Sequence, residues 1–189
     1  MQEAVPANKG AMAAIMGVEV EKIFEVLTEV NGIVSVANLN SHTQVVISGE
    51  KEAVDEAVKK INSVKVTYLP VSAPFHSELM LPAEEKLAAD LDEVVFKNPA
   101  FPVINNVEAV EVTTGEHARE SLKKQVTRPV LWHYTIMKFL KVKEIRKFTE
   151  IGSGRVLTGL AKRTARQEGI DIEIHNIRDL EDLKTIIKN

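Results

Sequence analysis

The 189-residue sequence contains no cysteine, which excludes disulfide bonds, cysteine-ligated zinc and a thiol nucleophile. No apolar run approaches the ~18–20 residues that a membrane-spanning helix needs. The first six residues lack the basic and apolar regions of a signal peptide, so we expect a cytoplasmic protein that does not bind membranes. A strong excess of charge is also missing, and the net charge of −3 argues against a general nucleic-acid binder.

The composition that remains is that of an ordinary globular protein, with 44% hydrophobic and 27% charged residues. It excludes a disordered, collagen-like or coiled-coil chain. A chain of this length forms one or two domains and buries roughly 70% of its unfolded surface, so it needs no metal to fold. No pair of histidines spaced four residues apart has an attendant carboxylate, and a metal site therefore has no support.

The first 70 residues alternate between short apolar strands and amphipathic helices. Strands are predicted for residues 11–17, 33–36, 45–47 and 64–68. Between them, two apolar stripes recur at helical spacing; they are Val20, Ile23, Phe24, Leu27 and Val30, then Ala53, Val54, Ala57, Val58 and Ile61. The resulting order, β-α-β-β-α-β, is typical of a ferredoxin-like fold.

The rest of the chain indicates an α/β arrangement. Strands are predicted for 103–106, 148–151 and 172–174, the first of them buried. Helices are predicted for 79–91, 118–126, 132–140, 156–166 and 180–187. Strands that alternate with helices favour a parallel sheet. The few strands available leave this parallel sheet incomplete.

His76 stands in a proline-punctuated loop, L-P-V-S-A-P-F-H-S over 69–77, between a predicted strand and a predicted helix. A loop histidine at a strand end is well placed to act as a general base. The alternative is a histidine that only caps the following helix or lies on the surface. Spacing alone favours that alternative.

Two other segments carry polar groups at strand ends. Gly152-Ser153-Gly154 could present backbone N–H groups to an anion, but it lacks the third glycine of a dinucleotide-binding motif. A tight turn is the favoured interpretation of that segment. Asn38 and Asn40 could line a site with their amides or could simply serve a turn.

Basic residues are concentrated in two stretches of the second half, namely Lys138, Lys141, Lys143, Arg146 and Lys147, then Lys162, Arg163 and Arg166. Either stretch could attract an acidic partner or a phosphate. A solvated helix face is an equally good interpretation.

Several motifs, taken in order, resemble those of bacterial malonyl-CoA:acyl carrier protein transacylases. They are M-Q-E-A-V-P (1–6), G-A-M-A-A-I (10–15), N-L-N-S (38–41), Q-V-V-I-S-G (44–49), P-V-S-A-P-F-H-S (70–77), N-N-V (105–107), P-V-L-W (129–132) and E-I-G-S-G-R-V-L-T-G-L (150–160). The resemblance covers essentially the whole chain. Three further family motifs do not occur in this sequence: a G-Q-G loop, the G-H-S-x-G that carries the nucleophilic serine, and the arginine that binds the malonyl carboxylate.

The resemblance implies that the chain is the C-terminal portion of a transacylase. Residues 1–9 would be a linker, and 10–71 the ferredoxin-like small subdomain. Residues 72–189 would be the C-terminal part of a larger, α/β-hydrolase-like subdomain with a parallel sheet. This division would account for the incomplete sheet.

The resemblance also implies a reaction. In this family a serine attacks the thioester of malonyl-CoA, and the acyl group then passes to the phosphopantetheine thiol of acyl carrier protein in fatty acid biosynthesis, without a metal or other cofactor. His76 would be the general base, oriented by the backbone carbonyl of Leu131. Phe75, Asn38 and Asn40 would line the substrate pocket, and Phe75 fits a malonyl rather than a branched acyl group. Acyl carrier protein would bind through the basic residues Lys138, Lys141, Lys162, Arg163 and Arg166.

The missing serine motif leaves a second interpretation open. The chain could be an inactive fragment, or a stand-alone ferredoxin-like binding module with a helical extension. Finding G-H-S-x-G and an arginine encoded directly upstream in the same reading frame would favour the enzyme.

Overall fold

The structure is a computed structural model that describes residues 9–71 and 73–187. The chain is a mixed α/β protein with two compact units, residues 1–135 and 136–189. Residues 1–8, which include most of the predicted linker, and Ser72 of the histidine loop lie outside the described residues. Residues 72–135, assigned from the sequence to the second subdomain, group with the first unit.

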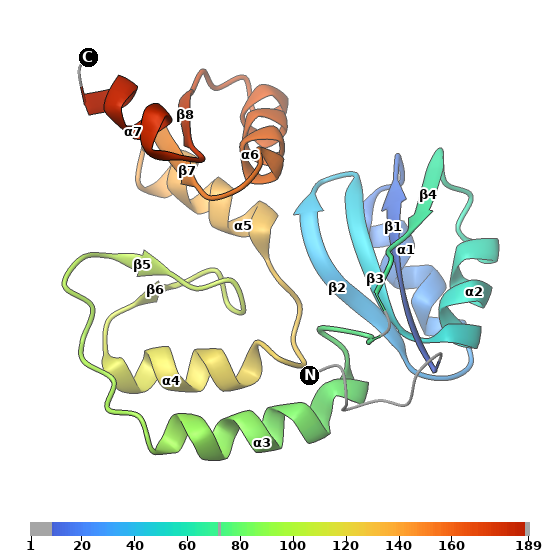
Figure 1. The fold of residues 1–189 in the computed structure, drawn as a ribbon. Helices are drawn as coiled ribbons and strands as arrows, with labels where there is room; N and C mark the ends of the chain where they lie inside the picture. The colour runs from blue at the N-terminus through green and yellow to red at the C-terminus, as the bar shows by residue number, and fades with distance from the viewer. Residues whose placement is uncertain (1–8, 72, 188–189) are drawn as a thin grey trace. The chain divides into compact units, whose positions relative to one another are not determined.

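A four-stranded antiparallel sheet occupies the first half of unit 1 (Figure 1). Its strands are β1 (Gly10–Met16), β2 (Val34–Ser41), β3 (Gln44–Glu50) and β4 (Lys65–Tyr68), and they lie in the order β2-β3-β1-β4. Helix α1 (Val20–Thr28) follows β1, and helix α2 (Lys51–Lys60) follows β3. These six elements lie where the sequence predicts them, although β2 continues well beyond the predicted end at Val36.

The two faces of this sheet are covered differently. Both helices pack on one face, where Ile15 of β1, Ile23 of α1, Ile47 of β3 and Val54 of α2 are fully buried in one apolar cluster. The helical spacing of the buried residues explains this packing, because it gives each helix one apolar stripe. The opposite face carries a smaller cluster of Met12, Ala14, Ala37 and Val46, against which the partly buried Phe75 packs.

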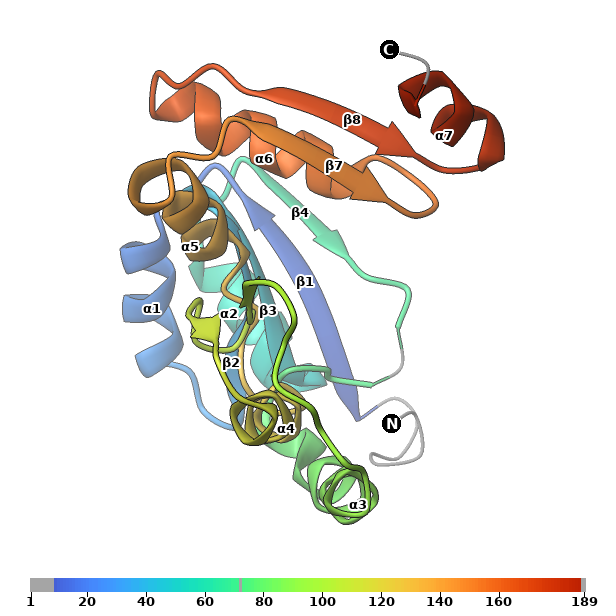
Figure 2. The same cartoon turned by 90° about the vertical axis from the view of Figure 1, so that its left-hand side faces the viewer.

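The second half of unit 1 is mostly helical. It contains the 3₁₀ turn η2 (Glu78–Met80), α3 (Leu81–Asp92), the short strands β5 (Val103–Ile104) and β6 (Glu111–Val112), and α4 (Gly115–Lys124). Helices α3 and α4 lie side by side (Figures 1 and 2). The predicted strand at 103–106 is only two residues long, and Val103 is 40% exposed rather than buried. Strand β6, its antiparallel partner, was not predicted.

Helix α5 (Trp132–Met137) runs across the boundary into unit 2, where a π-helical turn, η3 (Lys138–Val142), replaces the end of the predicted helix. Unit 2 continues with β7 (Lys147–Ile151), α6 (Val156–Gln167), β8 (Glu173–Ile177) and α7 (Leu180–Ile187). Strands β7 and β8 pair in parallel, as the alternation of strands and helices predicts. Leu160, Ala161 and Ala165 form the buried stripe of α6.

No helix among the described residues is long and apolar enough to cross a membrane.

Candidate active site

The loop that carries His76 joins β4 to η2 and is anchored at several points. Leu69, directly after β4, donates its N–H to the Met12 carbonyl at 2.9 Å. Ala73, Pro74, Ser77 and Met80 are fully buried. Pro74 packs so closely on β1 that any side chain at position 10 would collide with its ring, which explains the glycine there. The described residues of this loop, 69–71 and 73–77, are therefore held firmly within unit 1.

His76 itself has an unusual backbone conformation. Its φ is +59°, in the left-handed region that non-glycine residues avoid at a cost of roughly 1–2 kcal/mol. Such a conformation persists only where the surrounding structure imposes it, and it is concentrated at functional sites. The fully buried Pro74 and Ser77, close to His76 in the chain, provide that constraint here.

One ring nitrogen of His76 is engaged, and the other forms no hydrogen bond with any residue that the structure describes. Nδ1 lies 2.8 Å from the backbone carbonyl oxygen of Gln125. A carbonyl can only accept a hydrogen bond, so Nδ1 must carry the proton. In the neutral ring Nε2 then holds a lone pair, and it is the atom that can take up a proton from a substrate or a nucleophile.

The Gln125 carbonyl is held in place by its own side chain and by α4. Gln125 follows the last turn of α4, and its N–H donates to the Ser121 carbonyl at 3.0 Å. Its side-chain Nε2 donates to the carbonyls of Arg128 and Pro129, at 3.0 and 3.2 Å. The partner of His76 is therefore fixed from two sides.

The expected orienting carbonyl, that of Leu131, is not the partner of His76 in the structure. The Leu131 carbonyl accepts the N–H of Thr135 at 3.0 Å in the first turn of α5, and the Leu131 N–H donates to the Asn106 carbonyl at 2.7 Å. Leu131 also packs its side chain against the first sheet. The sequence offered no signal for Gln125, because a backbone carbonyl has no residue-specific signature.

Asn38 and Asn40 lie near the end of β2, where both are half-buried. The segment after Gln125 runs along this edge of the sheet: Leu39 donates to the Val130 carbonyl at 2.9 Å, and Val130 donates to the Ala37 carbonyl at 2.8 Å. The stretch 125–130 thus links the partner of His76 to the strand that carries both asparagines. Phe75 packs on the second face of the sheet against a cluster that includes Ala37 of β2, and also against a cluster that includes Val126.

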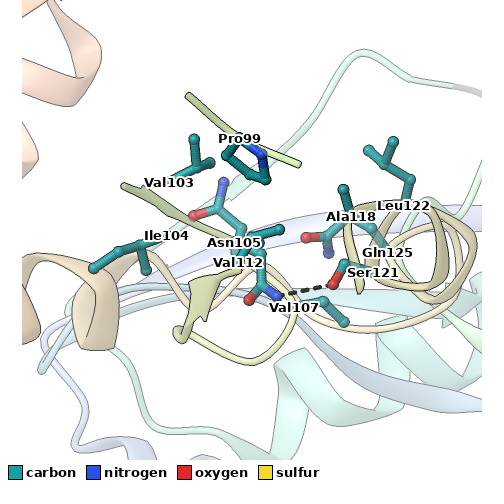
Figure 3. A pocket seen from close by; sticks show the side chains of 11 residues that line it. Pro99, Val103, Ile104, Asn105, Val107, Val112, Ala118, Ser121, Leu122 and Gln125 are labelled. Atoms are coloured by element: carbon teal, nitrogen blue, oxygen red, sulfur yellow. Dashed lines mark hydrogen bonds between the residues drawn. The ribbon is translucent and has the colours of Figure 1, made fainter. Parts of the chain in front are cut away.

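A hollow of about 410 Å³ lies between α4 and the β5–β6 pair, and Gln125 is one of its lining residues (Figure 3). Most of the lining is apolar, with Ile104, Val107 and Leu122 among the side chains. Figure 3 shows the polar pair within it, in which Asn105 Nδ2 donates to Ser121 Oγ at 2.9 Å. This bond ties the β5–β6 pair to the helix that presents the Gln125 carbonyl.

Asn105 belongs to a polar cluster around Glu108. The Glu108 carboxylate contacts His117 Nε2 at 3.0 Å, Asn105 Nδ2 at 3.2 Å and Lys124 Nζ at 3.2 Å. These hydrogen bonds, that of His117 foremost, lower the pKa of Glu108 to about 2. The cluster fastens both ends of α4, since His117 lies in its first turn and Lys124 in its last.

The glycine-rich segment of unit 2 is a turn that leads into α6, and a carboxylate already accepts N–H groups at the start of that helix. Gly152 and Gly154 have φ values of +144° and +122°. The carboxylate of Glu150 accepts the N–H of Leu157 at 3.2 Å and the N–H of Thr158 at 2.8 Å, at the start of α6. Burial acts against the charge, but these bonds and one from Asn176 hold the pKa of Glu150 below its usual range. An anion would have to compete with this carboxylate.

The basic residues of unit 2 differ in how they are engaged. Lys141 pairs with Glu168 at 2.9 Å. Lys162 and Arg166 lie one turn apart on the exposed side of α6, beside a shallow hollow, and neither has an ion-pair partner among the described residues. Lys138 and Arg163 both interact with other residues. Within the described ranges, no group of three or more His, Asp or Glu side chains could hold a metal ion.

Residues 1–188 match the family described as acyl transferase domain. Malonyl CoA-acyl carrier protein transacylase from Escherichia coli K12 is 42% identical over 168 residues, which cover 86% of this chain and 54% of that protein. Its counterpart from Bacillus subtilis is 39% identical over 197 residues, covering 96% of this chain and 62% of that protein. The chain thus spans about half to three fifths of the length of these relatives.

Solved structures that are similar in fold are also malonyl transferases by name. An acyl carrier protein S-malonyltransferase from Vibrio cholerae superposes with a TM-score of 0.91 at 39% identity, covering 98% of this chain and 61% of that one. A malonyl-transacylase in complex with its type II polyketide synthase acyl-carrier protein also reaches 0.91, at 40% identity, covering 100% of this chain and 61% of that one. The chain therefore belongs to the acyl transferase domain family.

Proposed function

We propose that this chain is the C-terminal part of a malonyl-CoA:acyl carrier protein transacylase. The full-length protein would transfer a malonyl group from malonyl-CoA to the phosphopantetheine thiol of acyl carrier protein, in fatty acid biosynthesis in the cytoplasm. The observation that carries the proposal is the contact between His76 Nδ1 and the Gln125 carbonyl, because it fixes the ring and leaves Nε2 without a hydrogen bond to any described residue. The relatives named above, all malonyl transferases by name, support the choice of acyl group.

His76 acts as the base in both halves of the proposed reaction. A serine hydroxyl is a poor nucleophile until a neighbouring base takes its proton. Nε2 takes that proton as the serine oxygen attacks the thioester carbonyl, and it returns the proton to the sulfur of coenzyme A as the C–S bond breaks. In the second half Nε2 takes the proton of the phosphopantetheine thiol, which attacks the malonyl ester, and returns it to the serine. The Gln125 carbonyl stabilises the charged ring at each stage.

The site would be built from both parts of the full-length protein, because this sequence lacks some of the family's motifs. The nucleophilic serine and the carboxylate-binding arginine would come from the remainder of the full-length protein. Residues 10–71 would form the ferredoxin-like small subdomain, whose strand β2 brings Asn38 and Asn40 to the substrate pocket. Residues 72–189 would form the C-terminal part of the large α/β-hydrolase-like subdomain, and Phe75 would border the malonyl group.

Acyl carrier protein is the proposed macromolecular partner. One of the solved relatives is a complex of a malonyl-transacylase with its acyl-carrier protein. Exposed cations favour an acidic partner and a phosphate-bearing arm. Of the basic residues considered, Lys162 and Arg166 have no ion-pair partner among the described residues and are therefore the best placed to bind it.

The proposal is tested by incubating malonyl-CoA and acyl carrier protein with this chain and, separately, with the full-length protein that contains G-H-S-x-G. Mass spectrometry of the carrier measures the malonylated product. We expect turnover near a typical kcat of ~10 s⁻¹ for the full-length protein and none for the chain alone. Turnover by the chain alone would place the nucleophile within these 189 residues. No turnover by either would favour a binding module.

A further inference from the structure

Ser77, directly after the histidine, is fully buried, and its hydroxyl forms a hydrogen bond within the same loop. Its Oγ donates to the carbonyl oxygen of Pro74 at 2.6 Å. The acceptor also sits at a fixed point, because Pro74 is itself fully buried and packed against Gly10 of β1. The bond therefore ties the C-terminal side of the histidine turn to the first sheet.

This bond spans the turn that contains His76. Pro74 and Ser77 are the first and fourth residues of the turn, and His76 is the third. A positive φ at the third position is usual for glycine or asparagine in type II turns and is unfavourable for histidine. Without a tie across the turn, the backbone of His76 could relax to negative φ, and the ring would then leave the Gln125 carbonyl.

We propose that Ser77 is a positioning residue for His76: its hydroxyl holds the histidine in the left-handed conformation and so maintains the Nδ1–H form of the ring. This inference rests on the proposed function of His76 as a base, and it adds a residue that does not touch the reacting atoms. The role requires a strong hydrogen-bond donor in the space that the Ser77 side chain fills. A purely space-filling role would require only the volume.

The primary readout is the ring tautomer of His76, which needs neither the nucleophile nor any acyl transfer. Nitrogen-15 chemical shifts of labelled histidine, recorded at alkaline pH in the 189-residue chain, distinguish Nδ1–H from Nε2–H. We expect an almost pure Nδ1–H form in the natural chain. In Ser77→Ala we expect a mixture of both tautomers, with exchange of the remaining Nδ1 proton at least ~10-fold faster, as for loss of one hydrogen-bond restraint.

Two further variants provide a replacement for Ser77→Ala and a matched control. Ser77→Cys keeps the shape of the side chain at a slightly larger volume but substitutes a weak donor. It therefore replaces Ser77→Ala if that variant does not fold, and the same shift in tautomer is expected. Ser41→Ala is the matched control. Ser41 is equally buried, but its hydroxyl has no hydrogen-bond partner in the described part of the chain, so the His76 tautomer should not change.

Activity of the full-length protein provides the second readout. Ser77→Ala should lower kcat about 10-fold with little change in KM, because the substrate contacts remain while the base is misplaced. A folded Ser77→Ala or Ser77→Cys variant with an unchanged Nδ1–H tautomer would overturn the inference. An altered tautomer with full activity retained by His76→Ala would instead refute the proposed function and leave the structural role of Ser77 intact.

Discussion

The histidine loop of unit 1 and the glycine-rich loop of unit 2 both follow a strand, precede a helix and contain residues with positive φ. They differ in what their polar groups do. In the first loop His76 is held by one ring nitrogen, and within the described part of the chain the other nitrogen has no hydrogen-bond partner. In the second loop Glu150 occupies the donors at the start of α6, and the positive φ values fall on glycines. The first arrangement keeps a reactive atom free at a fixed position, whereas the second joins a strand to a helix.

The surroundings of the two loops differ as well. Strands β1 and β3, beside the histidine loop, are buried along most of their length. Strand β7, which leads into the glycine-rich loop, has only every second residue partly buried, and Ile151 at its end is 77% exposed. Parallel strands are normally covered on both faces. This contrast agrees with the proposal that the full-length protein contributes further strands to the sheet of unit 2.

The largest expected effect is on the transfer activity, and it distinguishes His76 of unit 1 from His175 of unit 2. In the full-length protein, His76→Ala should lower kcat/KM by ~10²–10⁴, the usual loss for a general base. His175→Ala is the control, since His175 lies on β8, is 44% exposed and contacts Glu173. It should leave kcat/KM nearly unchanged. An equal loss in both variants would remove the functional distinction between the two regions.

The next largest effect is on the stability of the fold and comes from backbone strain at a glycine. Gly154→Ala should destabilise the protein by about 1–3 kcal/mol, because alanine pays for the positive φ even though the space around Gly154 is open. Gly159→Ala is the matched control within α6, where no described residue lies within 4 Å of the added methyl group, and it should stabilise the helix by about 0.5–1 kcal/mol. Thermal unfolding measures both changes. Destabilisation by Gly159→Ala, or none by Gly154→Ala, would contradict the assigned roles.

The smallest effect concerns Glu150 and depends on pH. Glu150→Ala should cost about 1 kcal/mol of stability at neutral pH, as for loss of a helix cap, while the transfer reaction continues. Because folding lowers the pKa of Glu150, its stabilisation is complete above the unfolded value of ~4.3 and is lost as the pH falls toward the folded pKa. Urea unfolding between neutral and acid pH should show a difference between natural and variant chains that shrinks with acid. A constant difference would mean that the carboxylate is not the cap.

Much of unit 1 could be predicted from the sequence because its patterns have strong periods. Val20, Ile23, Ala53, Val54 and Ala57 are buried as the helical spacing requires. The pattern included two residues too many: Phe24, in the middle of α1, is 48% exposed, and α1 ends at Thr28, before Val30. Strand β6 has only two residues, which is too short for any periodicity to register.

The site could be predicted only where side chains carry the signal. His76 stood out because of its type and its position in a loop between prolines. Gln125 did not, since its contribution is a backbone carbonyl, and the contact depends on where α4 ends. The hydrogen bond between Asn105 and Ser121 also joins residues far apart in sequence, and no local sequence pattern predicts it.

The most direct test of the central claim is to locate the malonyl group on the enzyme. The full-length protein is mixed rapidly with malonyl-CoA, quenched, digested and analysed by mass spectrometry. The account predicts a malonyl ester on a serine outside these 189 residues, formed at least ~10²-fold more slowly in His76→Ala. A malonyl adduct on a residue of this chain, or acylation at the natural rate in His76→Ala, would contradict it.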